Sequence, residues 1–286
     1  RMEDKWTFLK EGNQEGVPVS PFFDTEMIVC KNKNVEGGMG IHFFKNATVG
    51  GDWIIQEKMT NAKWLSELLP NAAPLSTMRV ITFSTWSLKY PARHQSPKTA
   101  LPRDRSNTAP DSGVDSPSSN QRLPKDPSAV EFISALSAVL RLGREGANTD
   151  HSSVMFDVDV NSGRVKGGVS NSQWYKLGLS APFNCPWLPT EDNVDTHPDS
   201  NQRITGRQVP GMAEAVDIVI QSHFVMMPQV PIVGWDVTFT PTGIYLLEVN
   251  LSCNFFRGSF DQAKYLETVE QYWKALENIE RSKYGY

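Results

Sequence analysis

The strongest constraint on the fold is a pair of alternating apolar and polar runs on either side of a short turn, over residues 234–250. The runs flank Pro241, Thr242 and Gly243, and glycine at the end of a short loop favours a left-handed backbone conformation. This pattern predicts a β-hairpin with a three-residue loop centred on Thr242. It therefore indicates antiparallel pairing in this part of the chain.

The same hairpin brings acidic side chains together. Symmetric pairing about Thr242 places Asp236 opposite Glu248, and Asn250 lies two residues further along the same face. Two facing carboxylates, with β-carbons roughly 5 Å apart, repel each other unless something neutralises them. One hypothesis is a divalent cation, Mg²⁺ or Mn²⁺, which prefers oxygen ligands completed by substrate phosphates. The other is a solvated acidic hairpin that shares its carboxylates with arginines, and a bulge at Gly243 would shift the pairing by one residue.

The remaining pattern interleaves strands with a few helices and predicts an α+β protein with largely antiparallel sheets. Strand-like runs cover 26–31, 41–44, 52–57, 78–88, 132–141 and 154–160, in addition to the two runs of the hairpin. The apolar spacing of 132–141 is also compatible with a helix. Helical patterns cover 3–11, 211–226 and 261–282, with Pro210 opening the second.

Composition limits the classes of function. The 286 residues carry a net charge of −4, which provides no broad field for attracting nucleic acid. No apolar run approaches the roughly 20 residues that a membrane span requires. The three cysteines are far apart and suit a reducing compartment, so we expect a cytoplasmic protein. Residues 91–128 contain seven prolines and no aromatic residue, which predicts a disordered insertion between two strands.

A glycine-rich segment follows the run at 26–31. Gly37, Gly38 and Gly40 would let backbone N–H groups approach phosphate oxygens, with Lys31 or Lys33 adding a positive charge. The same glycines also suit an ordinary turn between strands. The chain has neither a GxxxxGK[ST] motif nor a GxGxxG motif that opens a helix, which argues against P-loop and Rossmann nucleotide sites.

The order of motifs along the chain resembles that of the ATP-grasp superfamily. These motifs are the lysine and glycine loop, a run ending at Glu57, and the distant Asp236 and Glu248-x-Asn250. More specifically, the chain looks like the sugar-transfer associated ATP-grasp family, which is related to alpha-L-glutamate ligases. Further segments follow that family's order over nearly the whole chain outside the insertion: 76–79, 141–144, 149–153, 159–163, 197–200 and 206–210. His151 and Ser76 depart from the family pattern, at positions expected to touch the second substrate.

This resemblance implies an α+β ATP-grasp fold in which two lobes with largely antiparallel sheets clasp ATP. The glycine-loop lobe would span 1–59, and the metal-binding lobe would span 60–286 with the insertion at about 91–128.

The resemblance also implies roles for individual residues. Asp236, Glu248 and Asn250 would hold Mg²⁺, and Arg79, Arg141 and His151 would be catalytic. The residues expected to bind ATP are Lys5, Lys31, Gly37, Gly38, Gly40, Gln56, Glu57 and Met59.

The implied reaction is that of an ATP-dependent, ADP-forming carboxylate–amine ligase that works through an acyl-phosphate. Its partners would be a small-molecule carboxylate and an amine or sugar acceptor, in the biosynthesis of cell-surface polysaccharide. The alternatives are an ATP-grasp kinase that phosphorylates a small molecule and a non-catalytic nucleotide-binding module.

Overall fold

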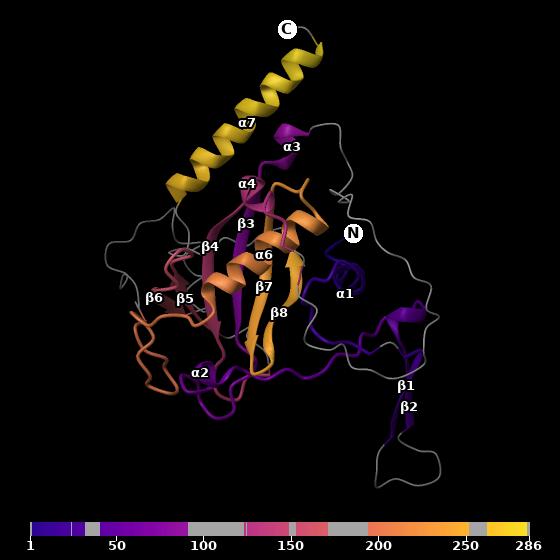
Figure 1. The fold of residues 1–286 in the computed structure, drawn as a ribbon. Helices are drawn as coiled ribbons and strands as arrows, with labels where there is room; N and C mark the ends of the chain where they lie inside the picture. The colour runs from indigo at the N-terminus through magenta and orange to yellow at the C-terminus, as the bar shows by residue number, and fades with distance from the viewer. Residues whose placement is uncertain are drawn as a thin grey trace, which may run out of the picture.

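A six-stranded antiparallel sheet is the centre of the fold, with strand order β6-β5-β4-β3-β7-β8 (Figure 1). The computed structural model describes residues 2–23, 25–31, 41–90, 123, 125–148, 153–170, 194–251 and 262–284. The strands of this sheet are β3 (Thr77–Ser84), β4 (Ile133–Leu142), β5 (Val154–Val158), β6 (Val165–Ser170), β7 (Ile232–Thr240) and β8 (Gly243–Asn250). All five neighbouring pairs are antiparallel, which confirms the predicted α+β class.

Helices lie around this sheet and at its ends. They are α1 (Lys5–Gln14), α2 (Lys63–Ser66), α3 (Trp86–Lys89), α4 (Ala129–Phe132), α6 (Met212–Met226) and α7 (Gln262–Tyr284), with a short 3₁₀ helix at Ala47–Val49. In Figure 1, α6 crosses one face of the sheet. Helix α2 lies near one end of the sheet, and α7 extends away from the other end.

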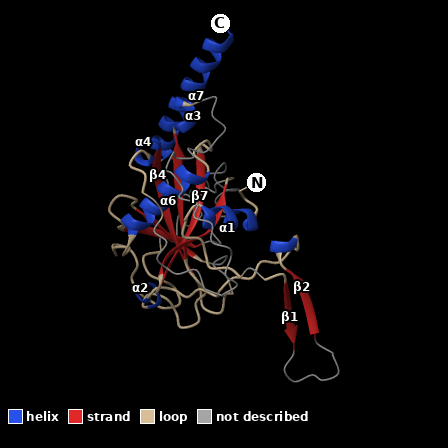
Figure 2. Ribbon diagram, turned by 45° about the vertical axis from the view of Figure 1, so that its right-hand side comes forward, coloured by secondary structure: helices blue, strands red, loops and turns tan. Residues whose placement is uncertain are grey.

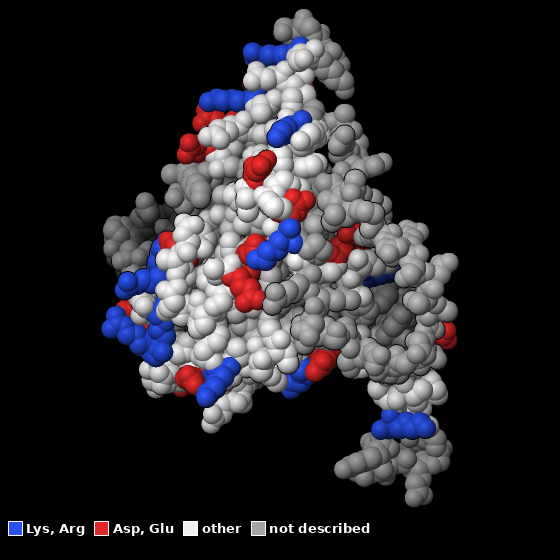
Figure 3. All heavy atoms as spheres, in the orientation of Figure 1, with Lys and Arg blue, Asp and Glu red and all other residues white. Residues whose placement is uncertain are grey.

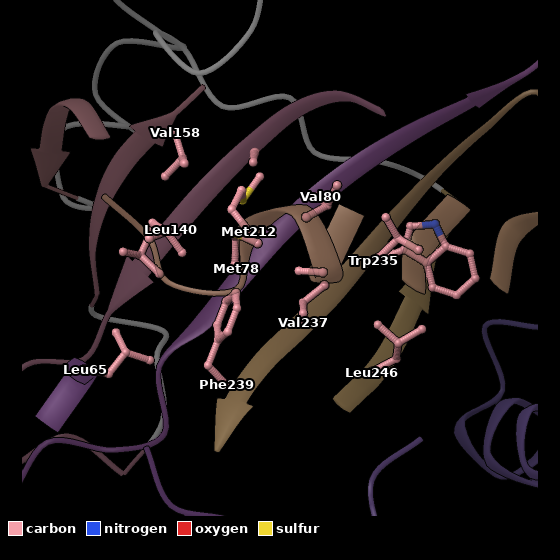
Figure 4. Packing of buried hydrophobic residues seen from close by; sticks show 14 of the residues in the cluster. Leu65, Met78, Val80, Leu140, Val158, Met212, Trp235, Val237, Phe239 and Leu246 are labelled. Atoms are coloured by element: carbon pink, nitrogen blue, oxygen red, sulfur yellow. The ribbon is translucent and has the colours of Figure 1, made fainter. Parts of the chain in front are cut away.

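The main hydrophobic core fills the space between the sheet and α6. Because side chains alternate along a strand, Met78 and Val80 of β3 face the same side as Trp235 of β7. These side chains are fully buried, and they pack in one cluster with Leu140 of β4 and Met212 of α6 (Figure 4). One face of the sheet is therefore committed to packing against α6, whereas the opposite face carries both polar side chains and smaller apolar clusters.

Several local predictions need correction. Residues 52–57 form no strand and make only isolated bridges at Trp53 and Gln56. The strand predicted over 78–88 ends at Ser84 because the chain turns into α3. The strand predicted over 132–141 is confirmed, and its helical alternative is excluded. Gly211, with φ of 77°, is the N-cap of α6, so Pro210 lies before the helix.

The N-terminal segment divides its packing between two places. Phe8 and Leu9 of α1 are buried in the main core against the large sheet. The hairpin of β1 (Met27–Lys31) and β2 (Ile41–Lys45) forms a separate two-stranded sheet that stands away from it (Figure 2). Cys30 of β1 is exposed.

Charged side chains of both signs are interspersed on the face that Figure 3 shows. Within the described part of the chain, no helix is both long enough and apolar enough to cross a membrane.

His223 of α6 is a fully buried histidine with both ring nitrogens satisfied. Its Nδ1 lies 2.7 Å from Thr82 Oγ1, and its Nε2 lies 2.9 Å from the carbonyl oxygen of Val230. Trp235 Nε1 donates to the same Thr82 hydroxyl at 2.8 Å. This network ties α6 to β3 and β7, which supports a structural role for His223.

We expect His223 to make the fold sensitive to acid. Burial lowers the pKa of His223 from 6.5 to about 4, so the unfolded chain binds a proton more readily between these values. The stabilisation that comes from keeping His223 neutral is complete above pH 6.5 and is lost as the pH falls to 4. It contributes about 3 kcal/mol to the free energy of unfolding. Urea unfolding of the wild type and of His223→Gln between pH 4 and 7.5 measures this slope, which should shrink in the variant. Equal slopes would contradict the assignment.

Candidate functional site

The β7–β8 hairpin sets the register of the candidate site. Thr240 pairs with Gly243, so the loop has two residues rather than the predicted three. This alone would place Asp236 opposite Leu247, but a bulge at Leu247 shifts the register again. Asp236 therefore faces Glu248, as symmetric pairing predicts, although the reason is a short loop combined with a bulge.

Two arginines come to the same face from the neighbouring strands. Arg79 of β3 pairs with Asp236 of β7, and Thr77 of β3 pairs with Arg141 of β4. Residues two apart on a strand share a face, so all of these side chains lie on the side of the sheet opposite α6. The candidate site is thus built on four adjacent strands, from β4 to β8.

Asp236 is the centre of a buried ion-pair network. The Nε atom of Arg79 donates to Oδ1 of Asp236, and its Nη2 donates to Oδ2 at 3.1 Å. Nη2 of Arg141 lies 2.9 Å from the same Oδ2. Nε of Arg141 is held by the hydroxyl of Thr77 at 2.8 Å. One carboxylate therefore orients two guanidinium groups.

One hydrogen-bond donor of this network has no acceptor among the described residues. Burial would raise the pKa of Asp236, but the Arg141 charge and the hydrogen bonds and charge of Arg79 outweigh it and lower the pKa below its usual value. Nη1 of Arg79, which is also buried, finds no acceptor among the described residues. An unmatched buried guanidinium donor is costly, so this position favours an anionic ligand.

Glu248 lies at the more open end of the site. Nζ of Lys5 is 3.2 Å from Oε2 of Glu248, with the lysine side chain 67% and the glutamate side chain 30% exposed. Nδ2 of Asn250 donates to Oε1 of Glu248 at 3.4 Å. The structure therefore brings together Lys5, Glu248 and Asn250.

We tested whether these residues fit a divalent cation. Asp236, Glu248 and Asn250 offer only oxygen donors on one face, which suits Mg²⁺. Across the described ranges, no group of three or more His, Cys, Asp and Glu side chains could hold a metal, so the Asn250 amide is needed as third donor. The donors fit in type and placement, but a cation at Asp236 has to replace a guanidinium contact.

The remaining predicted nucleotide residues lie in other places. Lys31 ends β1 on the separate hairpin and is exposed. Gln56 and Glu57 lie beside the segment that follows α1. The backbone N–H of Glu57 donates to the carbonyl oxygen of Pro21 at 3.1 Å, and Gln56 forms an isolated antiparallel β-bridge with Phe22. Met59 is partly buried. Four predicted site residues lie outside the described residues: Gly37, Gly38, Gly40 and His151.

His197, a further histidine of the family-like segments, has a structural environment. It is fully buried, with Nε2 at 3.1 Å from the Gly143 carbonyl oxygen. The neighbouring Asp199 accepts from both Nε and Nη2 of Arg144, at 2.6 and 2.7 Å. These contacts fasten the loop at 194–208 to the end of β4.

Asp157 of β5 is a candidate site residue that the sequence motifs did not indicate. It lies on the same sheet face as the arginines, since it pairs with Val139, which in turn pairs with Arg79. Its side chain is only 16% exposed. An acidic residue within the apolar run at 154–160 was the available signal.

Comparison with known proteins gives one family. Residues 130–257 match the family model described as sugar-transfer associated ATP-grasp. This segment contains Arg141, Asp236, Glu248 and Asn250, whereas Lys5, Lys31 and Arg79 lie before it. No curated protein and no solved structure matches the chain.

Proposed function

Because residues 130–257 belong to the sugar-transfer associated ATP-grasp family, we propose that this protein is an ATP- and Mg²⁺-dependent ligase that joins a carboxylate to an amine. The observation that carries the proposal is the meeting of two arginines and two carboxylates on one sheet face. Carboxylates bind the cation that accompanies ATP, and guanidinium groups bind the oxygens of an anionic substrate.

The residues of the chain have separable tasks in this proposal. Arg79 and Arg141 orient the substrate carboxylate, and Nη1 of Arg79 is the donor without an acceptor in the described residues. Glu248 and Asn250, with Asp236, bind Mg²⁺. When bound, the cation neutralises charge on the ATP phosphates. Lys5, now paired with Glu248, lies where it can contact a phosphate oxygen once the cation takes over that carboxylate.

The proposed reaction has two steps. A carboxylate oxygen of the substrate attacks the γ-phosphorus of ATP, and ADP leaves with the electrons of the broken bond. The amine then attacks the acyl carbon, loses a proton and displaces inorganic phosphate. The arginines stabilise the negative charge that develops on the acyl oxygen.

The sugar-transfer association of the matched family supports a carboxylate or amine carried on a sugar. We accordingly place the reaction in polysaccharide biosynthesis.

Product analysis tests the proposal. Incubation with Mg²⁺, ATP and panels of carboxylates and amines should release ADP and inorganic phosphate in equal amounts, together with an amide. Phosphate that remains on the acceptor would replace the ligase with a kinase. Absence of ADP release with every acceptor pair would favour a non-catalytic nucleotide-binding module.

A further inference from the structure

Four charged residues and one valine form a single row across the sheet. The registers pair Asp157 with Val139, Val139 with Arg79, Arg79 with Asp236, and Asp236 with Glu248. The row runs perpendicular to five strands, and every member lies on the face opposite α6. With strands about 4.8 Å apart, Asp157 lies about 10 Å from Arg79.

The part of this face between Asp157 and the arginines is apolar. Val139 and Met155 are buried and pack with Val169 in a cluster of their own, separate from the main core. Arg141 pairs with Met155, so it stands diagonally opposite Asp157 on the adjacent strand. Between the arginine pair and Asp157, this face of the sheet therefore consists of buried apolar side chains.

The Asp157 carboxylate is poorly compensated. Its ion-pair partner is Lys166 on β6, with Nζ 3.9 Å from Oδ2. That lysine is 57% exposed and lies closer to Asp159, at 3.5 Å. Burial raises the pKa of Asp157 to about 6, with Lys166 opposing and Asp159 adding to the effect. A second positive charge at Asp157 would relieve this deficit.

Arg79 provides an independent sign of a ligand. The residue is 4% exposed, and its Nη1 finds no acceptor among the described residues. Nε and Nη2 grip Asp236 along one edge of the planar guanidinium, so Nη1 points away from that carboxylate. Arg79 therefore has an unmatched donor, and Asp157, two strands away, has one long ion pair with Lys166.

We propose that the carboxylate substrate is bipolar: its anionic end binds Nη1 of Arg79 beside Arg141, and a cationic amino group within about 10 Å binds Asp157. This inference rests on the proposed function, because it assigns the substrate that the ligase activates. Asp157 is then a specificity-determining residue remote from the bond that forms.

The test uses a series of unbranched ω-amino carboxylic acids of increasing length, each matched with the plain monocarboxylic acid of that length. Calorimetric titration into the wild-type protein should show one preferred length, at which the amino acid binds at least about tenfold more tightly than its plain partner. Asp157→Asn should remove this preference and leave the binding of plain acids unchanged. Lys166→Met should raise affinity for the amino acids, because it removes the competing cation.

Two controls separate the possible failures. We expect Asp157→Asn to unfold in urea at pH 8 at the same or a higher midpoint, because the substitution removes a poorly compensated buried charge. Mg²⁺–ATP titration tests the proposed ligase independently of these probes. A preference for the amino acids that survives in Asp157→Asn would overturn the inference, as would failure of every ω-amino acid to bind the wild type.

Discussion

Replacing Glu248 with glutamine is expected to weaken Mg²⁺-dependent ATP binding about 100-fold, corresponding to about 3 kcal/mol for one charged ligand interaction. Glu248 is a proposed ligand that stays partly open, with a side chain 30% exposed, whereas Asp236 is buried. The glutamine keeps an oxygen donor but loses the negative charge that the cation needs. Calorimetric titration of ATP with and without Mg²⁺ measures the effect.

The same substitution should leave the fold intact. Its ion pair with the exposed Lys5 is a surface contact, worth at most about 1 kcal/mol. Glu214→Gln, on the exposed side of α6, removes an equal charge away from the site and serves as the matched control. If Glu248→Gln and Glu214→Gln bind Mg²⁺–ATP equally well, the hairpin does not hold the cation.

Replacing Arg79 with methionine is expected to lower the free energy of unfolding by about 3–5 kcal/mol, since it strands a buried carboxylate. The two side chains are 5% and 6% exposed, and Arg141 alone remains to compensate Asp236. Urea unfolding at pH 7 gives the value. The double variant Arg79→Met/Asp236→Leu should recover only part of the loss, because it removes the buried carboxylate but leaves Arg141, whose side chain is 14% exposed, without that partner.

The pH dependence has a defined sign. The arginines hold the folded-state pKa of Asp236 below its ordinary value, so this stabilisation is present above the unfolded pKa near 4 and is lost as pH falls through the lower folded value. Arg79→Met should reduce the stability that is lost as the pH falls, because Asp236 then has a smaller pKa shift. Arg144→Met serves as control, since its pair with Asp199 is 37% exposed on the arginine side and worth far less. Equal destabilisation by the two variants would contradict the buried network.

The arrangement at Asp236 combines both hypotheses that the sequence leaves open. Arginines share its carboxylate, as the hypothesis without a metal requires, yet the carboxylate is 4% exposed rather than solvated. Glu248 and Asn250 remain beside it as oxygen donors. A cation bound there would therefore compete with two guanidinium groups for one carboxylate.

Much of the fold follows from local patterning. Alternating runs predicted β1, β2, β4, β5, β7 and β8, and helical spacing predicted α1, α6 and α7, because periodicity reflects which side of an element is buried. The strand predicted at 52–57 is wrong, because β-branched and aromatic residues favour an extended backbone without providing a partner strand.

The sequence alone determined which chemical groups are available: two carboxylates and an amide at fixed spacing, arginines at strand positions, and a motif order typical of ATP-grasp proteins. Only the tertiary structure decided how they meet. The bulge at Leu247 set the facing of Asp236 and Glu248, and the pairing of β3 with β7 joined Arg79 to a carboxylate 157 residues away. Register between distant strands depends on sheet order and bulges, which no local period encodes, and so only the folded sheet places Asp157 on the same face as the arginines.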